Sequence, residues 1–493
     1  MTGRTDADPH LNWRFWWWTA GAALFAALVR FRYVFEPLAP DEGGYLAIAR
    51  AWRDGGALYT DVWIDRPQGM LFLYRIGDVF TGPGDGWLRL LAVVLGTSGI
   101  VGVAWMGRAL SGRWQAGAVA AVFAAVLSSS PAIEGFTANG ELMSAAFVVP
   151  GMAVTAAVVC DRLDRRWLFL AGVFVGLALS VKQSGYDGLI GTGLWLLAAW
   201  FTGWRKRSDL IVMGLWLTAG LAAFLGLLFW HGSTFGWDAY FDATIGFRLH
   251  SRSAVSTPQW GRLAVTAAIT AGISIGMLAL AAWRIRRLGS PLRSLLDRRT
   301  ALAACWLVGA GLALLTGGNY HRHYWITVVF PLALVLALIV ADREPSEDGP
   351  WPIPPRELVL ACVVPVVVTA VLRAVPGLEQ DDRLQQNRAI AAWVEDHREG
   401  TNGILLPVCG SADYHVVAGQ TPPYRYLWVD NVVAADDAID DMVALIEDPD
   451  GPAFVARFQP LTDCDETGRV EAALEQNFEE AAVVEGIPVL RRR

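Results

Sequence analysis

Long apolar segments recur along the chain, and they constrain its fold more than any other feature. A helix needs roughly 20 mainly apolar residues to cross a bilayer. With 54% hydrophobic and only 18% charged residues, the chain is more apolar than a soluble domain requires. We therefore expect residues 1–375 to form an all-α polytopic membrane domain of about 11 transmembrane helices. The segments are 15–35, 87–107, 115–132, 141–160, 167–182, 186–203, 209–230, 262–283, 301–317, 324–341 and 357–375.

Clusters of basic residues predict the orientation of these segments. Loops rich in Lys and Arg stay in the cytoplasm, and three such clusters, at 165–167, 205–207 and 284–299, all follow even-numbered segments. The first residues lack the pattern of a cleaved signal peptide. We therefore expect a multi-pass protein of the cell membrane with a cytoplasmic N-terminus and with residues 376–493 outside.

Residues 376–493 differ from the rest of the chain, because they carry 23 acidic and 9 basic residues, a net charge of −14. An acidic lobe argues against nucleic acid as a partner. Its pattern predicts a small extracytoplasmic α/β C-terminal domain. Cys409 and Cys464 both lie there, where a disulfide is permitted, and the sequence leaves their pairing open. The segments are "DRLQQNRAIAAWVEDHRE", "GILLPV", "ADDAIDDMVALIE", "AFVARF", "RVEAALEQNF", "EEAAVV" and "IPVLR".

The first outer loop, residues 36–86, holds the strongest candidates for chemistry. It contains the adjacent carboxylates Asp41 and Glu42, two glycines directly after them, and Arg66 in "IDRPQG". An acid just beyond a membrane span is often only a solvated loop residue. Here the glycines allow the backbone to turn close to a ligand. An acid and a fixed cation can also divide a task, one taking a proton while the other binds phosphate.

Three further outer segments carry unusual polar residues. Asn139 and Glu141 stand at the start of the fourth apolar segment, where helix capping and a direct part in the site are both open. Lys182 is one of only 2 lysines against 38 arginines and lies where a lipid phosphate would be, although snorkelling also explains such lysines. His321 and His323, in "GGNYHRHYW", suit an anionic head group or act as plain anchors. We expect Glu141, Asn139 and His321 to shape the site or contact the acceptor.

The sequence offers no signature of a bound cofactor. It has no CxxC or HExxH spacing and no G-x-G-x-x-G after a strand, which are the patterns of zinc and dinucleotide sites. We therefore expect no structural metal site and no cofactor. A divalent metal held by acidic pairs remains open, but it is not expected.

Several segments of the chain resemble those of a known protein family. The segments "PDEGGYLAIARAWRDGGALYTDVWIDRPQG", "TANGELM", "GLALSVKQ" and "HYWITVVFPLAL" resemble the GT-C superfamily of integral-membrane glycosyltransferases. They are most similar to the branch of dolichyl-phosphate-mannose-protein mannosyltransferases and lipid A aminoarabinose transferases. The resemblance implies a GT-C-like membrane domain that takes a hexose or pentose from a polyprenyl-phosphate donor. It further implies transfer with inversion, among membrane lipids, to an acceptor glycan, lipid or protein at the outer face.

The resemblance also implies residue roles. Asp41 would be the general base that deprotonates the acceptor hydroxyl, and Glu42 would support the site. Arg66 would bind the donor phosphate, although this chain has "RPQG" where the aminoarabinose transferases have a basic residue and two prolines. Lys182 and His323 would neutralise the leaving lipid phosphate.

Two other classes of protein compete with this interpretation. A lipid or sugar transporter or flippase would be expected to show internal repeats and polar residues in mid-membrane, and neither is clear here. A non-catalytic scaffold does not explain why Asp41, Glu42, Arg66 and Lys182 gather at one predicted face. If the enzyme interpretation holds, we expect these four residues to converge on one cavity open to the outer leaflet and solvent.

Overall fold

A computed structural model describes residues 9–81, 85–249, 259–288, 297–342, 355–373, 383–398 and 403–493. The chain forms two compact units. The first comprises Met1–Val34, Arg89–Leu228 and Pro258–Leu378, and the second comprises Phe35–Leu88, Phe229–Thr257 and Glu379–Arg493. The predicted first outer loop therefore groups with the C-terminal residues. The predicted boundary between residues 375 and 376 lies outside the described part of the chain.

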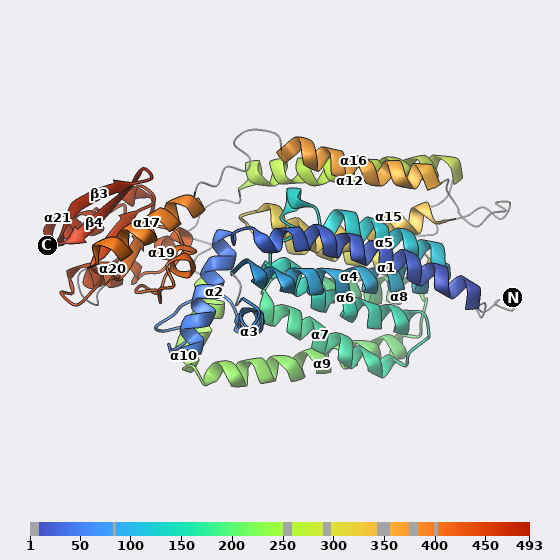
Figure 1. The fold of residues 1–493 in the computed structure, drawn as a ribbon. Coiled ribbons are helices and arrows are strands. Elements are labelled where there is room, and N and C mark those ends of the chain that lie inside the picture. Colours follow the sequence, from blue (N-terminus) through green and yellow to red (C-terminus); the bar gives the residue numbers. More distant parts are fainter. Residues whose placement is uncertain are drawn as a thin grey trace. The chain divides into compact units, whose positions relative to one another are not determined.

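Long helices make up the first unit, and each of the eleven predicted segments coincides with one of them (Figure 1). Five of these helices, α4, α6, α9, α12 and α15, are long and apolar enough to cross a membrane when the short turns before α4 and α15 are included. The total of eleven spans stays a prediction. The helices are α1 (Pro9–Arg32), α4 (Leu90–Ser111), α5 (Trp114–Ser128), α6 (Gly140–Val159), α7 (Leu168–Val181), α8 (Asp187–Thr202), α9 (Arg207–Ser233), α12 (Trp260–Leu288), α14 (Ala301–Leu315), α15 (Ile326–Val340) and α16 (Pro355–Arg373).

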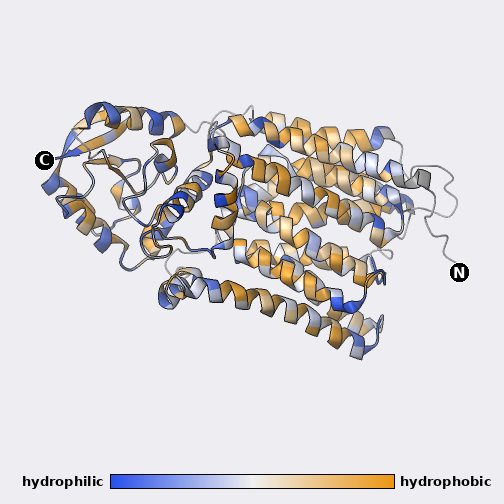
Figure 2. Cartoon of the chain, turned by 60° about the horizontal axis from the view of Figure 1, so that its bottom comes forward, coloured by the Kyte–Doolittle hydropathy of each residue, from blue (hydrophilic) through white to orange (hydrophobic). Residues whose placement is uncertain are grey.

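The surface of this unit is apolar as well as its core. Figure 2 shows hydrophobic residues along the whole length of its helices. On α9, for example, Leu215 is 63% exposed and Leu227 is 61% exposed. A helix that is apolar on every side needs either a protein interior or a bilayer around it. A lipid bilayer is the environment that suits such exposed leucines.

Three arginine-rich loops meet at one end of the first unit. Asp161, in the connection between α6 and α7, accepts a hydrogen bond from Arg298 at 2.6 Å and also pairs with Arg205. Arg205 lies between α8 and α9, and Arg298 lies just before α14. The described parts of the three basic clusters that predict the orientation therefore share one end of the first unit.

The second unit joins short helices to a small sheet. Two of its helices come from the first outer loop, and the C-terminal lobe supplies the strands (Figure 1). All seven predicted elements of the C-terminal domain are present. The elements are α2 (Pro40–Arg53), α3 (Gly69–Asp78), α10 (Trp237–Phe241), α17 (Arg383–His397), β1 (Leu405–Val408), α18 (Tyr414–Val417), α19 (Val429–Ala434), α20 (Ala438–Glu447), β2 (Phe454–Arg457), α21 (Arg469–Asn477), β3 (Phe478–Val484) and β4 (Ile487–Arg492).

The sheet has the strand order β1-β2-β4-β3. Strands β1 and β2 are parallel, with Leu405 opposite Phe454, because helices α18 to α20 carry the chain back between them. Strand β4 is antiparallel to both of its neighbours. Leu405, Phe454 and Val489 are fully or nearly fully buried against Ile390 of α17. This small core is the α/β lobe that the alternating pattern predicts.

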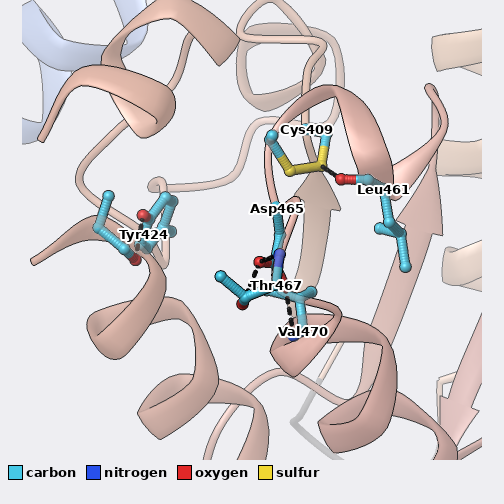
Figure 3. The surroundings of a disulfide bond; sticks show 8 residues. Cys409, Tyr424, Leu461, Asp465, Thr467 and Val470 are labelled. Carbon is cyan, nitrogen blue, oxygen red and sulfur yellow. Dashed lines mark hydrogen bonds between the residues drawn. A yellow bond between two sulfur atoms is a disulfide. The ribbon is translucent and has the colours of Figure 1, made fainter. Parts of the chain in front are cut away.

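A disulfide joins Cys409 to Cys464, so the pairing that the sequence left open is present (Figure 3). Cys409 directly follows β1, and Cys464 follows the short turn Leu461–Asp463 after β2, so the bond joins the segments that leave two neighbouring parallel strands. Beside it, Asp465 accepts hydrogen bonds from the backbone amides of Thr467 and Val470. These bonds hold the start of α21 close to the disulfide.

Replacing both disulfide cysteines by serine should destabilise the C-terminal lobe. The bond closes a loop with a sequence separation of 55, for which loss of chain entropy in the unfolded state corresponds to roughly 4 kcal/mol. Urea-dependent proteolysis of the full-length protein in detergent measures the change. The matched control is Cys305→Ser, because Cys305 is a free cysteine of the first unit. Equal urea midpoints for the double variant and the wild type would contradict the expectation.

Candidate active site

The two predicted carboxylates stand in the first turn of α2. Pro40 is its first residue, where proline is favoured, and acids in this turn are stabilised by the helix dipole. Glu42 is 1% exposed, and its Oε2 accepts a hydrogen bond from the backbone amide of Ala39 at 2.9 Å. Asp41 is partly exposed. Glu42 therefore helps to hold the start of the helix, while Asp41 is accessible to a reactant.

A tryptophan of the C-terminal lobe contacts Asp41. Trp428, directly before α19, donates a hydrogen bond from Nε1 to Asp41 Oδ1 at 3.0 Å. The glycines that follow the carboxylates make this approach possible. A Cβ atom on Gly43 would lie 2.5 Å from Cβ of Asp413, and one on Gly44 would lie 2.6 Å from the Trp428 ring. Two glycines after the acids are thus required by packing between α2 and the C-terminal lobe.

Tyr45 links Asp41 to Arg66. It lies four residues after Asp41, hence on the same face of α2, and its ring centroid is 5.1 Å from that of Trp428. Arg66 donates from Nε to the Tyr45 hydroxyl at 3.2 Å, and its guanidinium lies 5.7 Å from the centroid of the Tyr45 ring. We call Asp41, Tyr45, Arg66 and Trp428 the Asp41–Arg66 cluster.

The Tyr45 phenol stays protonated in this cluster. Burial raises the pKa of Tyr45 well above its ordinary value, and the positive charge of Arg66 offsets this only in part. A neutral phenol accepts the Arg66 hydrogen bond and still has its own proton to donate. The cluster therefore presents one carboxylate and one guanidinium, joined by neutral rings.

Contacts on both sides of Arg66 anchor the "RPQG" segment. Tyr59 donates a hydrogen bond to the backbone carbonyl of Arg66 at 3.1 Å. The Gln68 amide donates to Nδ1 of His231 at 3.2 Å. Asp65 forms an ion pair with Arg248. A cation held on an anchored segment is preorganised for an anionic group, because binding then requires little further ordering.

A second group of charged residues lies in the first unit, and we call Glu134, Glu141, Lys182 and His323 the Glu134–Lys182 cluster. Lys182 and Glu141 form an ion pair in which both side chains are less than one-tenth exposed. Nδ1 of His323 donates to Glu134 at 2.7 Å, and its Nε2 lies 3.9 Å from Glu141. The Lys182 ammonium lies 4.0 Å from the centroid of the Tyr324 ring. The positive charge of Lys182 is therefore balanced by Glu141.

Asn139 and His321 lie beside this cluster. Asn139 caps α6, because its Oδ1 accepts a hydrogen bond from the amide of Leu142 at 2.8 Å. The exposed His321 ring stacks on His323, with centroids 5.6 Å apart. Capping, one of the two interpretations left open by the sequence, is thus present for Asn139. The predicted contributions of Asn139, Glu141 and His321 to a site stay predictions.

Gly44→Ala should weaken the contact between Trp428 and Asp41. The added methyl group would meet the Trp428 ring at 2.6 Å and Ala412 at 2.8 Å, so one of them must move. Overpacking of this kind costs about 1–3 kcal/mol of unfolding free energy. The thermal unfolding midpoint and the quenching of tryptophan fluorescence test this. In Gly193→Ala, the matched helical control with nothing within 4 Å, the midpoint should stay equal or rise. A Gly44→Ala midpoint equal to that of wild type would contradict the packing argument.

Comparison with known proteins identifies the architecture. No model of a known protein family matches the chain, and no curated protein matches it. Among solved structures, ArnT from Cupriavidus metallidurans in the apo state has a TM-score of 0.67 at 15% identity. The match covers 96% of this chain and 97% of that one. The chain has a GT-C fold.

Two further solved structures share this fold. ArnT from Cupriavidus metallidurans bound to undecaprenyl phosphate has a TM-score of 0.63 at 14% identity, over 96% of this chain and 97% of that chain. The oligosaccharyltransferase AglB from Archaeoglobus fulgidus, in complex with an inhibitory peptide and a dolichol-phosphate, has a TM-score of 0.54 at 13% identity. That match covers 94% of this chain and 72% of the other. The resemblance found in the motifs is confirmed at the level of the fold, which is that of a polytopic membrane protein.

The GT-C fold of this chain holds the predicted residues in two groups. Asp41, Glu42 and Arg66 lie in the second unit, and Lys182 lies in the first. The expected convergence of all four on one cavity stays a prediction. Trp428 is not predictable as a partner of Asp41 from the sequence, because 387 positions separate them and no local pattern links such positions. Among the described residues, no group of three or more His, Cys, Asp and Glu side chains is arranged to hold a metal ion.

Proposed function

We propose that the protein is a membrane glycosyltransferase that moves a hexose or pentose from a polyprenyl-phosphate donor to an acceptor at the outer face of the membrane. The observation that carries this proposal is the Asp41–Arg66 cluster. It supplies an accessible carboxylate and an anchored guanidinium, connected through Tyr45 and Trp428. These are the two groups that such a transfer requires, a base for the acceptor and a cation for the leaving phosphate.

In the proposed step, Asp41 accepts the proton of the acceptor hydroxyl while the hydroxyl oxygen attacks the anomeric carbon. The bond between the anomeric carbon and the phosphate oxygen breaks, and its electron pair leaves with the polyprenyl phosphate. Arg66 stabilises the charge that develops on that phosphate. The attack comes from the side opposite the leaving group, so the configuration inverts. The proton then passes from Asp41 to solvent.

The remaining predicted residues have supporting roles in this proposal. Glu42 holds the first turn of α2 and with it Asp41. Lys182 and His323 neutralise the leaving lipid phosphate once it replaces Glu141 and Glu134, with which they are paired before it binds. Asn139 and His321 shape the surroundings of that cluster.

Several observations support the membrane setting of the reaction. One of the similar structures is described as bound to undecaprenyl phosphate and another as bound to a dolichol-phosphate. The arginine-rich loops share one end of the first unit, which suits a cytoplasmic end. The disulfide of the C-terminal lobe suits an oxidising compartment. We therefore propose a cytoplasmic N-terminus and an extracytoplasmic C-terminal lobe.

The proposed reaction needs no cofactor. The lipid phosphate already activates the sugar, so nucleotide binding is unnecessary. Fixed cations can stabilise the leaving phosphate without a metal ion. We expect EDTA to leave donor turnover unchanged. If EDTA abolishes turnover and added Mg²⁺ or Mn²⁺ restores it, a metal ion belongs to the site.

The test is donor turnover by the purified protein. It is supplied with polyprenyl phosphates that carry mannose, glucose, arabinose or aminoarabinose, and release of the free lipid phosphate is followed by chromatography. The expected result is release of the lipid phosphate from one donor, with the sugar recovered either as the free, hydrolysed sugar or attached to an added acceptor. A transporter would move a donor across a vesicle membrane without releasing the phosphate. Such movement without cleavage would overturn the proposal.

A further inference from the structure

A cleft in the second unit lies between the C-terminal half of α2, the end of α3 and α18. Its volume is about 470 Å³, and its lining includes Arg50, Arg53, Asp78, His415 and Gln420. This volume falls in the range of sites for small molecules. Neither Asp41 nor Arg66 lines the cleft, so it is distinct from the Asp41–Arg66 cluster.

The charges that line the cleft are already paired. Nε of Arg50 donates to Asp78 at 2.9 Å, and its Nη2 donates to Asp85 at 2.7 Å. Arg53 pairs with Asp78 and, at 2.8 Å, with Asp54. Two guanidinium groups are thus paired with three carboxylates, Asp54 and Asp78 of the lining and Asp85 outside it, which leaves no excess positive charge to attract an anion. Their remaining donors and acceptors suit an uncharged ligand rich in hydroxyl groups.

His415 supplies a second, independent indication of a ligand. His415 is among the residues that line the cleft and is 2% exposed, and its Nδ1 has no hydrogen-bond partner within the described part of the chain. Burial lowers the pKa of His415 to about 3, so the ring is neutral at pH 7. A buried ring nitrogen without a partner is unfavourable. A ligand hydroxyl is a group that can either donate to it or accept from it.

The cleft is connected to Asp41 through a single helix. Arg50 lies nine residues after Asp41 on α2, a rise of about 13 Å along the helix axis. An acceptor larger than one sugar unit, with its reacting hydroxyl at Asp41, would extend over such a distance. No Phe, Tyr or Trp is among the residues that line the cleft, so binding there rests on hydrogen bonds and should be weak.

We propose that this cleft binds an uncharged saccharide and serves as a subsite for the part of the acceptor remote from the attacked hydroxyl. The acceptor role rests on the proposed function. Saccharide binding itself does not, because it depends only on the paired charges, the shape of the cleft and His415.

The test is saturation-transfer NMR on the full-length protein in a detergent without a sugar head group. The probes are methyl disaccharides of mannose, glucose, galactose or arabinose, with glucose 6-phosphate and glucuronic acid as charged probes. We expect millimolar binding of at least one uncharged disaccharide and weaker binding of both charged probes. Preferential binding of a charged probe, or no binding of any disaccharide, would overturn the proposal.

Variants locate the binding. Arg53→Ala should weaken disaccharide binding at least fivefold, and the matched control Arg469→Ala should leave it unchanged. Both arginines are about half exposed and paired with an exposed aspartate, but only Arg53 lines the cleft. His415→Phe should abolish binding, while His415→Asn should retain part of it through the side-chain amide. Equal affinities of Arg53→Ala and Arg469→Ala would place the saccharide elsewhere, whether or not the His415 variants fold.

The proposed saccharide site and the proposed function can be refuted independently of each other. Disaccharide binding without turnover of any donor would leave the saccharide site in place and refute the proposed function. Turnover without disaccharide binding would refute the subsite and keep the transferase. The two assays use different ligands and different variants, so each result is assigned to one proposal.

Discussion

Asp41→Asn should lower the rate of polyprenyl-phosphate release by roughly 100- to 10,000-fold, the usual contribution of a general base. The amide cannot accept the proton of the acceptor hydroxyl. It keeps the size of the carboxylate and still accepts a hydrogen bond from Trp428 Nε1, which lies 3.0 Å from Asp41 Oδ1. The fold should therefore be preserved. Single-turnover release with the donor identified in the panel measures the effect.

Two further variants sharpen this result. Asp61→Asn is the matched control, because Asp61 lies in the same loop and its carboxylate accepts a hydrogen bond from the amide of Ala57, which asparagine can also do. Trp428→Phe keeps an aromatic ring but removes the donor to Asp41, so a loss of roughly tenfold is expected, in line with one hydrogen bond to a charged group. An Asp41→Asn enzyme with at least half of the wild-type rate would refute Asp41 as the base.

Arg66→Ala should lower the same rate by roughly 100- to 1,000-fold, as the loss of one preorganised donor to a developing anion does. The guanidinium is held by the Tyr45 hydroxyl and lies over the Tyr45 ring, so it is positioned before the donor binds. Arg66→Lys should recover only part of the rate, because an ammonium cannot bind phosphate with two parallel hydrogen bonds. Rates at saturating donor separate this effect from weaker binding.

Arg75→Ala is the matched control for Arg66→Ala. Arg75 also lies over an aromatic ring, with its guanidinium 4.6 Å from the centroid of Trp52, and it belongs to α3 of the same unit. We expect a rate within twofold of wild type for Arg75→Ala. Similar losses in both variants would indicate that removing a stacked arginine disturbs the unit in general. In that case Arg66 has no specific part in the chemistry.

The local elements of this protein follow from its sequence. The apolar segments coincide with the helices of the first unit, and "GILLPV" and "AFVARF" contain strands β1 and β2. Hydropathy and periodicity are properties of neighbouring residues, so they predict elements without knowledge of the fold. The number of membrane spans is less determined, because α5 and α14 have only 15 residues each.

The candidate site, like the fold, is predictable from the sequence only in part. Asp41 and Arg66 lie in one loop, and their acid and basic character with two glycines nearby was enough to select them. The partner of Asp41 was not predictable, since Trp428 comes from the C-terminal lobe and no spacing relates the two. Lys182 was selected as a cation for phosphate, but its ion pair with Glu141 became visible only in the structure. The sequence shows which residues are charged, whereas the pairing of those charges depends on contacts in the folded structure.

The sequence by itself determined that this is a multi-helical chain with an acidic α/β lobe, because burial of apolar side chains follows local composition. Only the tertiary structure decided that the first outer loop packs with that lobe, that Gly43 and Gly44 admit Asp413 and Trp428, and that Cys409 pairs with Cys464. These contacts join residues far apart in the chain. Their formation depends on the free energy of the whole fold, which no single segment carries.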